Sequence, residues 1–193
     1  MTSLPVDNSF IFPNTFVTIR NLSSKVAYRA RVFDVRRDEV RLPSGQETTY
    51  EIVVHNGAVA MVPIDGDGRL ILVRQYRHST GKRLLELPAG TLEDGEAPDA
   101  CAQRELREEI GMAPGKLTRI AEFFLAPGYS TERMRIYLAQ DLSPEKLSTD
   151  EDEDLEIETL MMDEAFLRIE RGEIEDAKTI LGLYIAREKL ALL

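Results

Sequence analysis

The sequence predicts an α/β fold in which helices cover a mixed β-sheet, preceded by a small antiparallel β element. Three observations support this prediction. Apolar residues recur at every second position within the first 55 residues, a continuous apolar segment follows at 58–64, and helical periodicity appears three times further along. Strands interleaved with helices are typical of a layered α/β domain. We therefore divide the chain into an N-terminal β element, 1–55, and a main domain, 56–193.

The N-terminal element is predicted from its alternating pattern. Residues 26–42 place apolar side chains mostly at every second position, which indicates one strand with one polar face. The PSGQ sequence at 43–46 predicts a turn, and 48–55 reads as the returning strand. The apolar face of this pattern needs a surface to cover it, so we expect a symmetric homodimer.

The main domain begins with a segment, 58–64, that is almost wholly apolar. This composition predicts a central strand that is covered on both faces. The DGDG sequence at 65–68 predicts a hairpin that leads into a second strand, 69–77. Two further strands are expected at 133–142 and 154–162.

Helical periodicity predicts three helices, at 97–110, around 163–171 and at 177–190. Pro98 suits the first turn of the first helix, and Gly111 is placed to end it. The inner face of the last helix is predicted to consist of Ile180, Leu181, Tyr184 and Ile185.

Composition excludes several classes of function. The formal net charge of −10 argues against a nucleic-acid partner, because such partners are bound through Lys and Arg. No apolar run reaches the ~18–20 residues of a membrane span, so no membrane partner is expected. The first residues lack the features of a secretion signal, and the single cysteine, Cys101, excludes an internal disulfide. Together these features predict a cytoplasmic protein.

The stretch GTLEDGEAPDACAQRELREEIGM, residues 90–112, concentrates glutamates on the first helix. Like charges three or four positions apart destabilise a helix by ~0.2–0.5 kcal/mol per pair. Glu105, Glu108 and Glu109 nevertheless lie along one edge of the apolar face, and Arg104 is one turn before Glu108. Carboxylate oxygens at this spacing suit Mg²⁺, with Mn²⁺ as the alternative. The stretch therefore predicts a divalent metal site.

The spacing of the whole stretch resembles the Nudix box, G-x5-E-x7-R-E-U-x-E-E-x-G-U with U apolar, at every position. The resemblance implies a Nudix fold, an α/β/α sandwich, and hydrolysis of a nucleoside diphosphate linked to another group. The residues that carry it are Gly90, Glu96, Arg104, Glu105, Leu106, Glu108, Glu109, Gly111 and Met112.

Roles for the residues of the box follow from the same resemblance. The implied metal ligands of two or more ions are the carbonyl of Ala89 and the side chains of Glu105, Glu108 and Glu109. Arg104 would orient the glutamates, and Glu96 would brace the loop. Gly90 would let the backbone turn tightly, so that the Ala89 carbonyl could face a metal.

A wider region, roughly 48–188, resembles the ADP-ribose pyrophosphatase branch of the family. A proline about fifteen residues beyond the box is typical of that branch, and Pro127 is fifteen past Met112. The resemblance implies that Arg77, next to the ring of Tyr76, contacts the substrate, and that Glu132 reaches the terminal ribose hydroxyls.

The acidic run at 150–154 is expected to supply the general base. In similar proteins a mobile acidic loop before the last core strand carries a glutamate that activates water. Glu153 is the implied residue and Glu151 is the alternative.

The sequence thus predicts Mg²⁺-dependent hydrolysis of ADP-ribose to AMP and ribose 5-phosphate. Two alternatives stay open: hydrolysis of another nucleoside diphosphate sugar, such as GDP-mannose, and a non-catalytic sensor of ADP-ribose. In similar enzymes the N-terminal extension helps to close the partner's substrate site, and residues around Glu51 could do this here.

Overall fold

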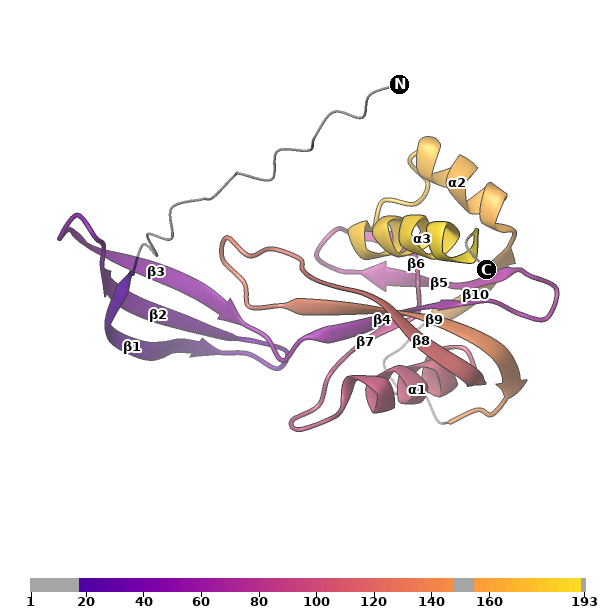
Figure 1. Cartoon of the computed structure of the whole chain (residues 1–193), viewed down its shortest axis with the longest axis horizontal. Coiled ribbons are helices and arrows are strands. Elements are labelled where there is room, and N and C mark those ends of the chain that lie inside the picture. Colours follow the sequence, from indigo (N-terminus) through magenta and orange to yellow (C-terminus); the bar gives the residue numbers. More distant parts are fainter. Residues whose placement is uncertain (1–17, 148–154, 192–193) are drawn as a thin grey trace, which may run out of the picture.

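The computed structural model describes residues 18–147 and 155–191. In these residues two β-sheets and three helices form a layered main domain, and a third, N-terminal sheet projects to one side (Figure 1). Within the main domain, α1 lies on one side of the strands and α2 and α3 lie on the other side (Figure 1). The predicted α/β/α sandwich with an antiparallel N-terminal element is confirmed. Among the described residues, no helix is both long and apolar enough to span a membrane.

The N-terminal sheet contains three antiparallel strands in the order β1-β2-β3. Their bounds are Arg20–Arg29 for β1, Asp34–Arg41 for β2 and Glu47–Val54 for β3. The single strand predicted at 26–42 is wrong, because the chain reverses at residues 30–33, where the Ala30 N–H bonds the Phe33 carbonyl at 3.0 Å. This turn contains no Gly, Pro or Asn, and the alternating pattern runs through it, so the sequence carried no turn signal.

A four-stranded mixed sheet forms the centre of the main domain, in the order β7-β4-β9-β8. The bounds are Ala58–Pro63 for β4, Ala89–Thr91 for β7, Met112–Phe124 for β8 and Arg133–Pro144 for β9. All six residues of β4 are buried, and β4 pairs with β7 on one side and in parallel with β9 on the other. The predicted central strand is therefore confirmed.

The second sheet of the main domain has the order β10-β5-β6. Its strands are Leu70–Arg77 (β5), Lys82–Glu86 (β6) and Leu155–Leu160 (β10). The DGDG turn forms as predicted, with Gly68 at φ +77°, but the two strands that it joins do not form a ladder. Only Ile64 and Leu70 form a bridge, after which β4 and β5 enter different sheets. A turn sequence fixes the local reversal, whereas pairing depends on which neighbours each strand meets.

Strand β8 was not predicted. It contains Pro114 and Gly115, which are both depleted in strands and obscure the pattern. β8 lies at the edge of its sheet, where a missing N–H is tolerated, and Gly115 approaches β9 so closely that a Cβ there would lie 3.0 Å from Asp141.

Two helices enclose the central sheet from opposite faces. α1 (Pro98–Glu109) packs on the side of Val59 and Met61, and α3 (Ala177–Leu190) packs on the side of Ala60 and Val62. Alternate residues of β4 therefore contribute to different cores. α2 (Met162–Glu170) packs beside α3 through Ala165 and Phe166.

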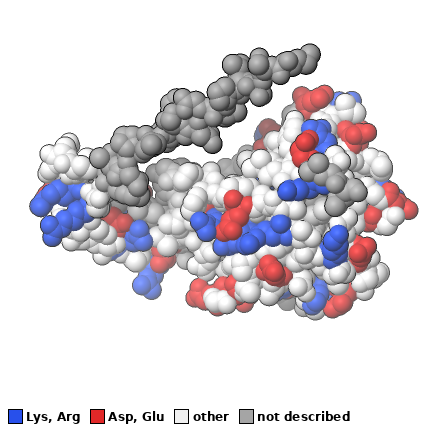
Figure 2. Space-filling model, in the orientation of Figure 1, with Lys and Arg blue, Asp and Glu red and all other residues white. Residues whose placement is uncertain are grey.

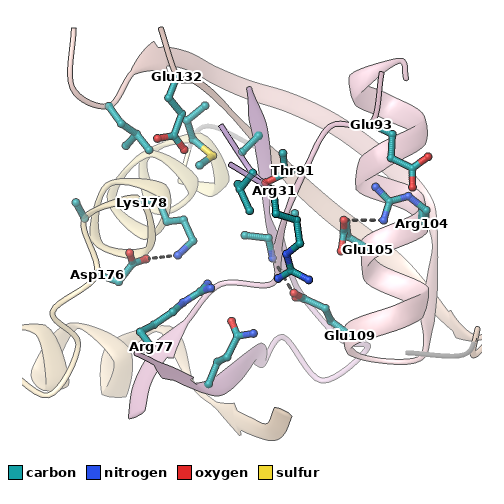
Figure 3. A pocket seen from close by; sticks show the side chains of 18 residues that line it. Arg31, Arg77, Thr91, Glu93, Arg104, Glu105, Glu109, Glu132, Asp176 and Lys178 are labelled. Atoms are coloured by element: carbon teal, nitrogen blue, oxygen red, sulfur yellow. Dashed lines mark hydrogen bonds and ion pairs between the residues drawn. The ribbon is translucent and has the colours of Figure 1, made fainter. Parts of the chain in front are cut away.

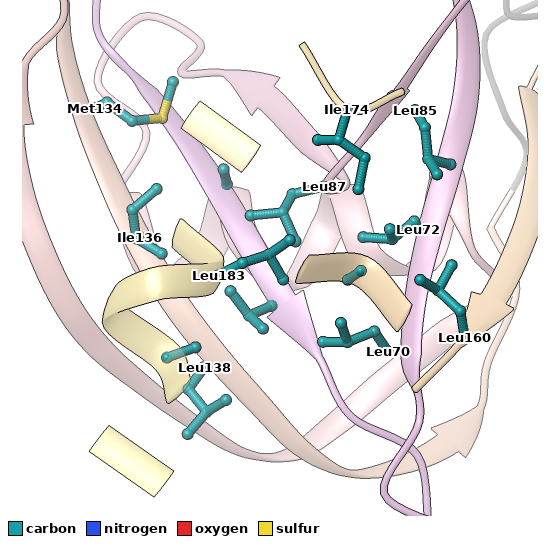
Figure 4. Packing of buried hydrophobic residues seen from close by; sticks show 14 of the residues in the cluster. Leu70, Leu72, Leu85, Leu87, Met134, Ile136, Leu138, Leu160, Ile174 and Leu183 are labelled. Atoms are coloured by element: carbon teal, nitrogen blue, oxygen red, sulfur yellow. The ribbon is translucent and has the colours of Figure 1, made fainter. Parts of the chain in front are cut away.

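The inner face of α3 differs from the predicted one. Of the predicted residues, Ile180 packs against the core, whereas Leu181 and Tyr184 are exposed. The fully buried residues are Thr179, Gly182, Leu183 and Ala186. Gly182 has no Cβ, which lets α3 pack closely on the segment at Leu87: a Cβ at position 182 would lie 2.6 Å from Cδ1 of Leu87. Figure 4 shows Leu183 among Leu87, Ile136 and Leu138 in this core. The prediction favoured large apolar side chains throughout, whereas close contact with the sheet places the small residues Gly182 and Ala186 beside Leu183.

Candidate functional site

A pocket of about 690 Å³ opens between α1, strand β7 and the first turn of α3 (Figure 3). Its α1 wall carries Arg104, Glu105 and Glu109, and its opposite wall carries Arg77 and Lys178. Acidic and basic groups therefore face each other across the cavity. Three predicted metal ligands (Ala89, Glu105 and Glu109) and two predicted substrate contacts (Arg77 and Glu132) are brought to the same place by elements that are far apart in sequence. The fourth predicted ligand, Glu108, does not line this pocket.

Arg104 organises the carboxylates of α1. Its guanidinium donates to both oxygens of Glu96 at 2.9 and 3.0 Å, to Glu105 at 2.7 Å and to Glu108 at 2.9 Å. These contacts agree with the orienting role inferred for Arg104. The hydrogen bonds from Arg104 lower the pKa of Glu96 to about 2. The side chain of Glu96 also accepts the Glu93 N–H at 3.0 Å, so it holds the loop before the helix in place.

Glu105 and Glu109 are the two buried carboxylates of the α1 wall, at 8% and 6% exposure. They lie one helical turn apart and line the pocket together with the backbone of Ala89, whose N–H donates to Glu109 at 3.0 Å. Burying charged groups costs free energy unless partners compensate. Their burial shows that this edge of α1 faces the protein interior, as the apolar stripe predicted.

The reason for a glycine at 90 differs from the one predicted. Gly90 lies in β7, pairs with Val59 and is not among the residues with positive φ. A Cβ at this position would lie 1.8 Å from Oε1 of Glu105 and 1.9 Å from its Cδ. Gly90 is therefore required for space rather than for a tight turn: the Glu105 carboxylate occupies the volume that any other side chain would fill. Gly111, at φ +69°, ends α1 as predicted.

The donor chemistry of this wall suits a hard divalent cation. Carboxylate and carbonyl oxygens are the ligands that Mg²⁺ and Mn²⁺ prefer, and the space created by the absent Cβ of Gly90 holds one of these carboxylates at the cavity wall. As the side chains stand, no group of three acidic, His or Cys side chains within the described ranges is already arranged around one ion position. Arg104 instead forms ion pairs with Glu105 and Glu108.

The opposite wall is built around Glu86, whose side chain is 2% exposed. Arg77 donates to its two oxygens at 2.9 and 2.7 Å, and Lys178 also bonds one of them. Burial alone would raise the pKa of Glu86, but the hydrogen bonds from Arg77 and Lys178 outweigh it and lower the pKa. Arg77 therefore presents a fixed positive charge to the cavity.

The other predicted residues divide into three groups. Glu132 lines the pocket, on the side of the loop at 125–132 (Figure 3). Tyr76 does not line it: adjacent strand residues point to opposite faces, and the half-exposed Tyr76 ring packs edge-on against His78, 6.2 Å between centroids. Pro127 is exposed outside the pocket. The general-base candidates Glu151 and Glu153 lie outside the described residues.

Several pocket residues were missed by the sequence analysis, and two of them are cationic. Arg31 reaches the cavity from the turn between β1 and β2, and Lys178 reaches it from the first turn of α3. Neither lies in a recognisable motif. Glu51, around which we expected contacts to a partner's site, is exposed and lies 3.9 Å from Arg37, and it does not line the cavity.

Comparisons with known proteins agree with this geometry. The family model described as NUDIX domain matches residues 54–182, and the model described as nucleoside diphosphate sugar hydrolase N-terminal domain matches residues 19–53. An ADP-ribose pyrophosphatase of Mycobacterium tuberculosis is 50% identical over 92 residues, which are 47% of this chain and 44% of that protein. An ADP-ribose pyrophosphatase of Bacillus subtilis is 38% identical over 105 residues, which are 54% of this chain and 57% of that protein. The matched region thus spans about half the length of these two relatives.

A solved structure extends the similarity to nearly the whole chain. It is described as the crystal structure of an ADP compounds hydrolase, and it superposes with a TM-score of 0.81 at 32% identity, over 90% of this chain and 94% of that one. The NUDIX model, at residues 54–182, by itself covers more than half of the 193 residues. The chain therefore belongs to the NUDIX family.

Proposed function

We propose that this protein hydrolyses the diphosphate bond of ADP-ribose to AMP and ribose 5-phosphate. The observation that carries the proposal is the pair of buried carboxylates, Glu105 and Glu109, facing Arg77 across one pocket. The activities named for the relatives from M. tuberculosis and B. subtilis support the choice of substrate.

Glu105, Glu109 and the Ala89 carbonyl, with Glu108, would hold the metal, which we propose to be two or more Mg²⁺ ions, with Mn²⁺ as the alternative. When bound, the metal would neutralise the phosphate charge and acidify the attacking water. For this, Glu105 and Glu108 must exchange part of their contact with Arg104, which lies within 2.9 Å of both.

The other roles belong to residues of the chain itself. Arg77 would donate hydrogen bonds to the diphosphate, since Glu86 engages only part of its guanidinium. Glu132 would accept hydrogen bonds from the terminal ribose. Glu153, or else Glu151, would take a proton from the water that attacks phosphorus, and no covalent intermediate is needed. Tyr76 and Pro127 have no role in this proposal, because both lie outside the pocket.

A panel of substrates tests the proposal. The purified protein is incubated with ADP-ribose, GDP-mannose, UDP-glucose, NADH, FAD and a diadenosine polyphosphate, with Mg²⁺ or with a chelator, and the products are separated by chromatography. Preferential formation of AMP and ribose 5-phosphate, dependent on Mg²⁺, is the expected result. Preferred cleavage of GDP-mannose would transfer the function to the first alternative. Tight binding of ADP-ribose without cleavage would establish the sensor.

We also propose a cytoplasmic homodimer formed through the N-terminal element, 1–55. All ten residues of β1 are exposed in the single chain, including the apolar side chains of Leu22, Val26 and Tyr28. A second copy would cover this surface. Light scattering coupled to size exclusion measures the mass directly, and a monomeric mass at micromolar concentration would contradict the dimer.

A further inference from the structure

The wall of the pocket opposite α1 contains a group of four charges. Arg77 and Lys178 carry positive charge, Glu86 and Asp176 carry negative charge, and their sum is zero. Lys178 contacts both carboxylates: it bonds Glu86, and its Nζ lies 2.9 Å from Asp176. Its side chain is 11% exposed, so the ammonium is largely removed from water and depends on these partners.

The position of Lys178 is fixed by the start of α3. Asp176 caps that helix by accepting the Thr179 N–H at 3.0 Å, and the Thr179 hydroxyl accepts the Leu87 N–H at 2.8 Å. The first turn of α3 is thereby attached to the chain segment that follows Glu86. Lys178 thus approaches Glu86 from an anchored element, and its ammonium has little freedom to move.

Arg77 depends on the same carboxylate. Of the five N–H donors of a guanidinium, Glu86 engages one on Nε and one on Nη2. This two-point contact sets the plane of the group and directs the remaining donors away from Glu86. Figure 3 shows the side chains of Arg77 and Lys178 close to each other in space, both extending toward the cavity. Any shift of Glu86 therefore rotates Arg77.

We propose that Lys178 is a positioning residue for substrate binding: it holds Glu86 so that Arg77 faces the diphosphate. Without Lys178, the buried Glu86 keeps a single cationic partner and Asp176 loses its ion pair, so the wall gains a net negative charge. Arg77 is then drawn toward both carboxylates, since Glu86 and Asp176 each attract it. This inference rests on the proposed function in one respect, the contact of Arg77 with the diphosphate.

A double-mutant cycle separates positioning from other roles. The variants are Lys178→Met, Arg77→Ala and their combination, with Lys178→Arg as the charge-conserving rescue. Lys82→Met is the matched control, because Lys82 forms an exposed ion pair with Glu175 outside the pocket. Affinity for ADP-ribose is measured by calorimetry in the presence of chelator, and KM and kcat are measured with Mg²⁺. Melting temperatures are recorded for every variant.

We expect Lys178→Met to weaken ADP-ribose binding and to raise KM by about tenfold, with kcat within about twofold of the wild type. In the Arg77→Ala background the same substitution should change affinity by less than about twofold, because there is no guanidinium left to orient. Lys178→Arg should restore most of the affinity, and Lys82→Met should match the wild type.

Equal losses in both backgrounds would overturn the inference, since Lys178 would then act on the substrate or the fold independently of Arg77. Wild-type affinity in either Lys178→Met or Arg77→Ala would overturn it as well. If the wild type binds and cleaves another panel member instead of ADP-ribose, the proposed substrate fails, and the cycle is run with that compound because every panel member carries a phosphoanhydride group. If it binds no panel member, both proposals fail.

Discussion

Replacing Gly90 with alanine tests whether the backbone of β7 positions Glu105. The new Cβ would lie 1.8 Å from the Glu105 carboxylate, and real contacts of this kind are essentially never shorter than 3.0 Å. The carboxylate must therefore retreat by more than an ångström. Misplacement of a catalytic group by ~1 Å can lower a rate by ~10²-fold, so we expect kcat for ADP-ribose to fall by about that factor.

The fold should tolerate this substitution far better than the activity does. The colliding group is the end of a flexible side chain, and an altered rotamer costs only ~0.5–1.5 kcal/mol. Replacing glycine by alanine at a compatible backbone position offsets part of that cost, by ~0.4–1 kcal/mol. We therefore expect a change in melting temperature of only a few degrees.

The assay compares initial rates of AMP formation at saturating Mg²⁺ with thermal melting of the same preparations. Gly66→Ala is the matched control, because a Cβ at Gly66 meets nothing within 4 Å. A Gly90→Ala variant that keeps a rate within about threefold of the control would refute the reasoning, since Glu105 would then work equally well from another position.

Three further predictions concern stability and assembly. The folded protein lowers the pKa of Glu96 to about 2, so its carboxylate adds to the free energy of unfolding above pH about 4.5, and this contribution is lost as the pH falls toward about 2. Glu96→Gln should abolish this pH-dependent contribution, which urea unfolding between pH 2 and pH 7 measures. Gly182→Ala should lower the free energy of unfolding by ~1–3 kcal/mol, because its Cβ would lie 2.6 Å from Leu87; calorimetric melting would contradict this if the midpoint were unchanged. Tyr28→Glu should shift the mass in light scattering toward that of a monomer, and a mass equal to the wild type would show that β1 is outside the interface.

Ion pairs on the surface are the alternative source of any loss seen in the Lys178 variants. On the face shown in Figure 2, lysines and arginines lie beside aspartates and glutamates. Exposed pairs such as Arg41 with Glu47 and Lys82 with Glu175 contribute little free energy. Losses in the Lys178 variants can therefore be assigned to its largely buried pair with Glu86 rather than to the surface.

The carboxylate wall on α1 could be predicted from sequence because its geometry is local. Residues one helical turn apart share a face, so Glu105 and Glu109 had to lie together, and the apolar stripe determined that this face points inward. The resemblance to the Nudix box implied that Glu96 braces the loop and that Arg104 orients the glutamates, and in the structure Arg104 donates to Glu96 at 2.9 Å. Helix ends at Pro98 and Gly111 followed from backbone chemistry alone.

The opposite wall could not be predicted, because its contacts depend on distances in space. Arg77 and Lys178 are a hundred positions apart, and only the packing of α3 against the sheet brings both to Glu86. Arg31 enters the cavity through a turn that has no sequence signal.

The sequence by itself determined the helix, the carboxylate spacing and the central strand, since these depend on local periodicity. Only the tertiary structure decided why position 90 must be glycine: the side chain that needs the space, Glu105, comes from a different element. It also decided that β4 and β5 part after their turn and which face of α3 is buried. Each of these depends on which surfaces meet, and close packing between elements is a property of the folded chain as a whole.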